Sequence, residues 1–76
     1  MSIISRSVIT VSRTATVFEA VELMASAEIG SVVVVDEGQV VGIFSERDVM
    51  NRVVLEDRNP KKTTVEEVMS HNWRAM

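Results

Sequence analysis

Two closely spaced segments of this chain are apolar almost without interruption, and they limit its possible folds more than any other feature. These segments are Val32–Val35 and Val40–Phe44, and the polar stretch Asp36–Gln39, which contains Gly38, separates them. β-branched residues favour extended strands, and a glycine can take the positive φ that a tight turn requires. The pattern therefore predicts a β-hairpin whose strands cover Ser31–Asp36 and Gln39–Phe44.

The hairpin strands lack the alternation of apolar and polar residues that marks a sheet with one solvent-facing side. Two helices from a chain of 76 residues can cover only one face of such a sheet. Leaving about 400 Å² of apolar surface in water forgoes on the order of 10 kcal/mol of transfer free energy, comparable to the stability of a domain. We therefore expect a second copy to cover the other face, giving a homodimer or a higher oligomer.

A first strand and a first helix are expected before the hairpin. Ser7–Ser12 is rich in β-branched residues and apolar at alternate positions, which predicts a strand. Thr16 and Glu19 have the spacing of a capping box and predict the start of a helix. Gly30 suits the left-handed position that ends such a helix. The apolar face of this helix comprises Val17, Ala20, Val21, Met24 and Ala27.

Two further helices are expected after the hairpin. Ser45 and Asp48 have the spacing of an N-cap and an acidic third residue, and they begin a helix that ends near Asp57. Thr64 and Glu67 repeat the capping pattern of the first helix and begin a short third helix. The apolar stripe of the second helix comprises Val49, Met50, Val53 and Val54.

The chain is long enough for one domain, 1–76, of marginal size. We predict an α+β fold in the order β-α-β-β-α, with a three-stranded mixed sheet and two helices on one face. The predicted core spans 7–57, a polar linker with a proline spans 58–63, the short helix spans 64–70 and the tail spans 71–76.

Composition argues against several classes of function. The net charge of −3 and the 4% content of aromatic residues disfavour nucleic-acid binding. There is no cysteine, and the single histidine, His71, has no second metal ligand nearby in sequence. No nucleophile stands in a context that suggests an adjacent base. We therefore expect no catalytic residues, no metal, no cofactor and no enzyme activity.

The apolar segments are also far too short for the roughly 20 residues that cross a bilayer. The N-terminus lacks the apolar region of a signal peptide. We therefore expect no membrane partner and a cytoplasmic location.

Four stretches of the chain resemble the CBS-domain family, specifically one motif of the paired CBS (Bateman) module. The most specific is Gly42–Asp48, which matches the family's ligand signature of glycine, two apolar residues, serine or threonine and, three positions later, aspartate. The resemblance covers roughly residues 8–70, and the family usually places two motifs in one chain. Either this chain is a piece of such a protein or the pair is built from two chains. The other stretches are Val8–Ala20, Gly30–Asp36 and Thr64–Ser70.

The resemblance implies an adenosine-containing ligand, such as AMP, ADP, ATP or S-adenosylmethionine, in a cleft between two motifs. It assigns Asp48 to the ribose hydroxyls and Ser45 to ribose or phosphate. A carboxylate can accept two hydrogen bonds from a cis-diol, and a guanidinium pairs with phosphate. Ligand binding would then signal by changing how the motifs pack. The other candidate ligand residues are Ile9, Thr10 and Val11 beside the adenine, Arg13 and Arg47 opposite a phosphate, and Thr14 in the cleft loop.

The same residues also suit a protein that binds no ligand. Ser45 and Asp48 are equally expected if they only cap a helix, and Arg13 and Arg47 if they are solvated. Gly42 indicates a bulge or a close backbone approach, either to a ligand or to a helix. The alternative function is therefore a ligand-free dimerisation or interaction module.

Overall fold

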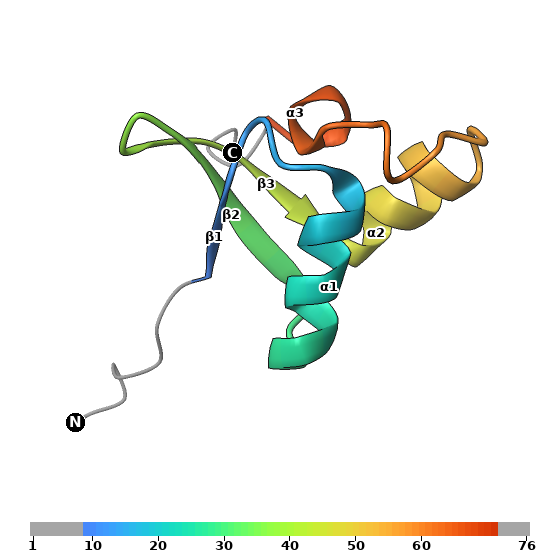
Figure 1. Ribbon diagram of the computed structural model, residues 1–76, viewed down its shortest axis with the longest axis horizontal. Helices are drawn as coiled ribbons and strands as arrows, with labels where there is room; N and C mark the ends of the chain where they lie inside the picture. Colours follow the sequence, from blue (N-terminus) through green and yellow to red (C-terminus); the bar gives the residue numbers. More distant parts are fainter. Residues whose placement is uncertain (1–8, 72–76) are drawn as a thin grey trace.

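The computed structural model describes residues 9–71 and builds a three-stranded sheet with helices packed against one side (Figure 1). In chain order the elements are β1 (Thr10–Ser12), α1 (Val17–Ala27), β2 (Ser31–Asp36), β3 (Gln39–Ser45), α2 (Glu46–Asp48), the π-helix η2 (Val49–Val54) and α3 (Val65–Val68). β1 pairs in parallel with β2, and β2 pairs antiparallel with β3. This mixed sheet confirms the predicted α+β fold. Ser7 and Val8 of the predicted first strand, and tail residues 72–76, lie outside the described residues.

A capping box begins α1, as predicted. The Glu19 N–H donates to Thr16 Oγ1 (3.1 Å), and the Thr16 N–H donates to Glu19 Oε1 (3.0 Å). The two bonds fix the start of the helix at Val17. On the predicted apolar face, Val17, Ala20 and Met24 are buried, Val21 is half-buried and Ala27 is exposed.

The end of α1 corrects the prediction for Gly30. Glu28, not Gly30, takes the left-handed conformation, with φ 57°. Because the chain turns there, the Ile29 N–H donates to Met24 O (3.0 Å) and Ile29 packs against the core. The Gly30 carbonyl instead accepts a hydrogen bond from the Glu46 N–H (3.0 Å). The helix ends early because Ile29, the next apolar residue, turns into the core.

The predicted hairpin is confirmed. Glu37 and Gly38 form its turn with φ values of 51° and 80°. Two consecutive left-handed residues give the turn whose twist matches that of the flanking strands. The register shifts between Val34 and Val35, next to Gly42, so the bulge that the glycine suggests is present.

The side of the sheet that faces the helices holds the core. Phe44, Val32 and Val34 project from adjacent strands and are at most 2% exposed. The alternation of side chains along β2 directs these valines toward the helices. The remaining members of the core are Val11, Val17, Ala20, Met24, Val53, Val65, Val68 and Met69.

The opposite side of the sheet is less completely apolar than the sequence suggests. Val33, Val35 and Ile43 are half-buried there. Their neighbours on β1, Thr10 and Ser12, are polar and exposed. The apolar surface on this side is therefore confined to β2 and β3, the two strands of the hairpin.

The second helix is irregular. Ser45 begins α2 as predicted, but the chain continues from Val49 as a π-helix, whose hydrogen bonds join residues five apart. The predicted apolar stripe of this helix is buried only in part. Val53 is buried and Val49 half-buried, whereas Met50 and Val54 are 56% and 65% exposed.

Two helix starts that are far apart in sequence lie side by side. Thr16 and Thr64 form an antiparallel bridge, and the Val65 N–H donates to Ala15 O (2.9 Å). The repeated capping pattern thus marks a contact within one chain. Val17 and Val65 follow the two caps and are both fully buried in the same core.

Candidate ligand-binding site

Ser45 and Asp48 lie where β3 passes into α2, and they bind each other. Asp48 Oδ2 accepts hydrogen bonds from the Ser45 N–H (2.9 Å) and from Ser45 Oγ (3.1 Å). Asp48 is only 6% exposed. The helix cap that the spacing predicts is confirmed, and it uses both lone pairs of one carboxylate oxygen.

The other oxygen of Asp48 faces the segment that follows α3. Asp48 Oδ1 accepts a hydrogen bond from Ser70 Oγ (3.2 Å) and lies 3.8 Å from Arg52 Nε. Arg52 also donates through Nη1 to Met69 O (3.1 Å). Sequence reasoning missed Ser70 and Arg52, because no local pattern joins Asp48 to a hydroxyl 22 residues away.

Backbone pairing fixes Ser70 beside Asp48. The Ser70 N–H donates to Ile43 O (2.8 Å), and the Ile43 N–H donates to Ser70 O (3.1 Å). A methyl group added at Gly42 would stand 2.7 Å from Met69 Sδ and 2.8 Å from Ser70 O. The close approach expected at Gly42 is therefore to Met69 and Ser70.

Ile9, Thr10 and Val11 lie at the opposite edge of the sheet. The Val33 N–H donates to Ile9 O (3.1 Å), and in a parallel pair this pattern turns the backbone groups of Thr10 toward the open edge. Neighbouring strands are about 4.8 Å apart, so β1 and β3 are separated by about 10 Å, with β2 between them. A single chain does not bring β1 next to the end of β3.

Arg13 and Thr14 stand at the other end of the sheet from Ser45. The Arg13 N–H donates to Val35 O near the end of β2, whereas Ser45 pairs with Ser31 at its beginning. The structure thus divides the candidate residues among three places: the end of β3, the β1 edge and the loop after β1.

The Arg13 guanidinium is shared between two carboxylates. Its Nη1 donates to Glu66 Oε1 (2.6 Å), and its Nε lies 3.2 Å from Asp36 Oδ1. These two hydrogen bonds, chiefly the one to Glu66, raise the pKa of Arg13 above its ordinary value. A phosphate here would have to displace a carboxylate, and the phosphate contact of Arg13 stays a prediction.

Arg47 differs from Arg13 in its surroundings. It is exposed on α2, between the Ser45 cap and Asp48 in sequence. Within residues 9–71 it forms no salt bridge. Its charge is therefore more accessible to a phosphate than that of Arg13.

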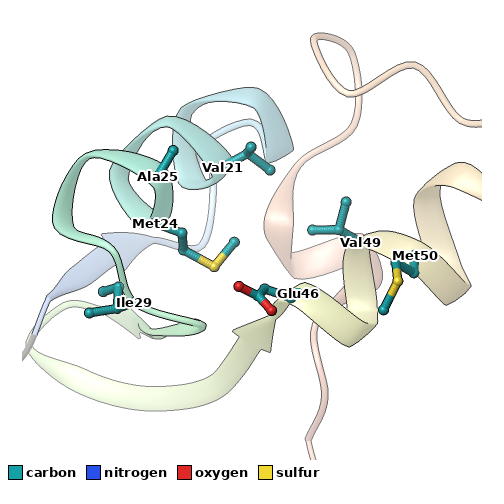
Figure 2. Close-up of a pocket in the computed structure, with 7 residues that line it drawn as sticks. All are labelled: Val21, Met24, Ala25, Ile29, Glu46, Val49 and Met50. Atoms are coloured by element: carbon teal, nitrogen blue, oxygen red, sulfur yellow. The ribbon is translucent and has the colours of Figure 1, made fainter.

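Two grooves flank α1. One, of about 280 Å³, separates α1 from α2 and η2, and Figure 2 shows Met24 pointing across it toward Glu46. The other, of about 530 Å³, lies between β1 and α1 and is lined in part by Thr10 and Val11. Asp48 lines neither groove. The first groove is lined by Val21, Met24, Ala25, Ile29, Glu46, Val49 and Met50.

The described residues form neither a bilayer-crossing helix nor a metal-binding cluster. No helix within 9–71 has the length and apolar content to cross a bilayer. In the same part of the chain, no cluster of three histidine, cysteine or acidic side chains is placed to hold a metal ion.

Comparison with known proteins identifies the family. The sequence profile of the CBS domain matches residues 1–55. This chain belongs to the CBS-domain family. A protein from Methanopyrus kandleri is 41% identical over 66 residues, which cover 86% of this chain and 34% of that protein. The chain spans 12% to 34% of the length of the curated relatives that it matches.

Solved structures agree with this CBS assignment. A protein with CBS domains from Burkholderia ambifaria MC40-6 superposes with a TM-score of 0.83 and 42% identity, covering 87% of this chain and 48% of that one. The CBS domain protein PAE2072 from Pyrobaculum aerophilum, solved with AMP, gives a TM-score of 0.78 at 22% identity. That match covers 87% of this chain and 51% of the other, and at this level of identity it supports only the similarity of fold.

Proposed function

We propose that this chain is a regulatory CBS module that pairs with a second copy and binds an adenosine-containing ligand between the two motifs. The candidate ligands are AMP, ADP, ATP and S-adenosylmethionine. Binding is proposed to signal by changing how the motifs pack. The Burkholderia relative, named for a proposed role in signal transduction, and the Pyrobaculum complex with AMP are consistent with this function.

The observation that carries the proposal is the position of Asp48. Its carboxylate is buried at the end of β3, yet Oδ1 accepts only one hydrogen bond shorter than 3.5 Å from the described residues. A carboxylate oxygen has two acceptor positions, so a ribose hydroxyl can bind there. Arg47, the exposed residue that precedes Asp48 in sequence, is the candidate partner of a phosphate.

The separation of the candidate residues supports the proposed pairing. The backbone of Thr10 faces the open edge at β1, whereas Asp48 lies beyond β3. An adenosine compound that contacts both groups is best accommodated between two copies, with β1 supplied by one and Asp48 by the other. The half-buried Val33, Val35 and Ile43 supply apolar surface for such a contact.

Titration calorimetry with AMP, ATP and S-adenosylmethionine tests the proposal, on protein whose mass has been measured by sedimentation equilibrium. We expect a dimer at low micromolar concentration and saturable heat with at least one compound. A dimer that gives no heat with any of them would contradict the ligand proposal, and a monomer would contradict the pairing.

Exposed apolar side chains on η2 and at Leu55, which follows it, favour a second candidate, a ligand-free interaction module. Met50, Val54 and Leu55 are 56%, 65% and 76% exposed. Apolar side chains this exposed are suited to contact another protein surface. This candidate predicts a dimer whose melting temperature does not respond to nucleotides.

A further inference from the structure

We infer that Ser70 competes with ligand hydroxyls for Asp48, so that ligand binding displaces the Ser70 hydroxyl and weakens the attachment of the segment after α3. The inference rests on the proposed function, since it concerns the same carboxylate. Ser70 is not part of the serine-to-aspartate signature at Gly42–Asp48. Its role emerges only from its position in the fold.

Most hydrogen-bond acceptor positions of the Asp48 carboxylate are already occupied, so few are free for the two hydroxyls of a diol. Oδ2 already accepts two hydrogen bonds from Ser45, which hold the helix cap. Oδ1 accepts one from Ser70 at 3.2 Å. A ligand that donates two hydroxyls to Oδ1 must take the place of Ser70 as well as the free position, because one oxygen has two lone pairs.

The Ser70 hydroxyl can leave without disturbing the cap. Its side-chain oxygen donates to Asp48 Oδ1, whereas the cap bonds of Asp48 go to Ser45, on the other oxygen. Rotation about the Ser70 side-chain torsion breaks this single contact. The buried aspartate would then exchange a hydroxyl of the protein for a hydroxyl of the ligand, with no unpaired acceptor left in the interior.

Loss of this contact affects how the chain after α3 is held. Within residues 9–71, four hydrogen bonds hold Met69 and Ser70 to β3, α2 and η2: the Asp48 contact, two backbone bonds with Ile43, and the bond from Arg52 to Met69 O. Arg52 also lies near Asp48, with Nε 3.8 Å from Oδ1. A ligand at this oxygen therefore affects two of these four bonds, the one from Ser70 to Asp48 and the one from Arg52 to Met69 O. Ligand occupancy is thereby coupled to the residues that lead out of the motif.

The test is AMP titration calorimetry on the parent protein and on Ser70→Ala, Ser70→Thr and Ser31→Ala. Removal of the competing hydroxyl should tighten AMP binding by about fivefold in Ser70→Ala. Ser70→Thr keeps a hydroxyl and should bind as the parent does. Ser31 is exposed on β2 and should also leave the affinity unchanged. Thermal melts of all four proteins establish that each is folded.

Amide hydrogen exchange gives a second measurement. AMP should speed exchange of the Ser70 N–H in the parent and have a smaller effect in Ser70→Ala. Equal AMP affinity in the parent and Ser70→Ala would overturn the inference and leave the proposed function standing, as would slower exchange at Ser70 on adding AMP. Absence of AMP binding in all four proteins, with none for ATP or S-adenosylmethionine, would overturn the proposed function and this inference with it.

Discussion

The two ends of the central strand β2 hold their neighbouring segments by different means. At one end, Arg13 lies between Asp36 and Glu66, and all three side chains are two-fifths exposed or slightly more. At the other end, near the start of β2, the buried Asp48 is bonded by the hydroxyls of Ser45 and Ser70. Both ends attach the α3 region to the sheet. One end uses partly exposed charge pairs, and the other uses hydroxyls around a buried carboxylate, with Arg52 Nε 3.8 Å from its Oδ1.

This difference determines which end is suited to a ligand. A phosphate that binds Arg13 must compete with two carboxylates that already pair with it. A ribose that binds Asp48 Oδ1 replaces the neutral hydroxyl of Ser70 with hydroxyls of its own. The cation near this oxygen, Arg52, is held less closely, with Nε at 3.8 Å, than Arg13 is held by its carboxylates at 2.6 Å and 3.2 Å. Exchange of like groups costs little free energy, whereas removal of a charged partner costs more. The Asp48 end is therefore the better candidate, although the sequence alone suggests both.

The largest effect is expected from Asp48→Ala. Loss of two charge-assisted hydrogen bonds to the ligand should weaken AMP binding on the order of 100-fold. Loss of the cap should also lower the free energy of unfolding by about 1–2 kcal/mol. Asp36→Ala, at the other end of β2, is the matched control and should leave the AMP affinity within about twofold. If calorimetry gave both variants the same loss, the distinction between the ends would be wrong.

Gly42→Ala should give the next largest effect. The new methyl group would lie 2.8 Å from the carbonyl oxygen of Ser70, a backbone atom that cannot move aside without breaking its pairing with Ile43. We expect a loss of about 1–3 kcal/mol in urea unfolding. Gly30→Ala is the control, because the atoms nearest its methyl group would be those of the Glu46 carboxylate, at an ordinary contact distance of 3.6 Å. Equal stability of the two variants would show that the Met69–Ser70 segment can move away from the new methyl group at little cost in free energy.

Arg13→Gln should have a smaller effect, confined to the end of β2 where Arg13 pairs with Asp36 and Glu66. Loss of two exposed ion pairs should lower the melting temperature slightly, and high salt should shrink the difference from the parent protein. Exchange of the Glu66 N–H, which donates to Arg13 O, should become faster. The AMP affinity should remain within about twofold. A tenfold loss of affinity would instead support the phosphate contact that the sequence suggests for Arg13.

The smallest effect is expected from Glu67→Gln, on the stability of the protein at acid pH. Its carboxylate accepts hydrogen bonds from the Thr64 N–H (3.2 Å) and Thr64 Oγ1 (3.0 Å). These bonds, the backbone bond first, lower the pKa of Glu67 below its ordinary value of 4.5. Its stabilising contribution is therefore present above pH 4.5 and is lost as pH falls through the lowered pKa. Glu67→Gln should reduce the loss of stability between pH 5 and pH 3, roughly the range below the ordinary pKa. Identical pH profiles from thermal melts would contradict this assignment.

The features that the sequence predicts correctly depend on residues close together in the chain. Thr16 and Glu19 are three positions apart, as are Ser45 and Asp48, and each pair forms its cap by itself. The turn at Gly38 is equally local. Short-range hydrogen bonds of this kind can be predicted from spacing, because the backbone geometry between the partners is fixed.

The features that differ from the prediction depend on contacts across the fold. Glu28 replaces Gly30 as the left-handed residue because Ile29 turns into the core. The second helix continues as the π-helix η2, and two members of its predicted apolar stripe, Met50 and Val54, are exposed. The contact of Ser70 with Asp48 joins residues 22 positions apart and requires the pairing of Ser70 with Ile43. No periodic pattern in the sequence predicts that pairing.

The most direct test of the account is an AMP titration of the ¹⁵N-labelled protein followed by amide chemical shifts. The account predicts the largest shifts at Ser45, Asp48 and Ser70, with little change at Arg13 and Glu66. Shifts concentrated at Arg13 and Glu66, with Asp48 and Ser70 unchanged, would place the ligand at the wrong end of β2 and contradict it.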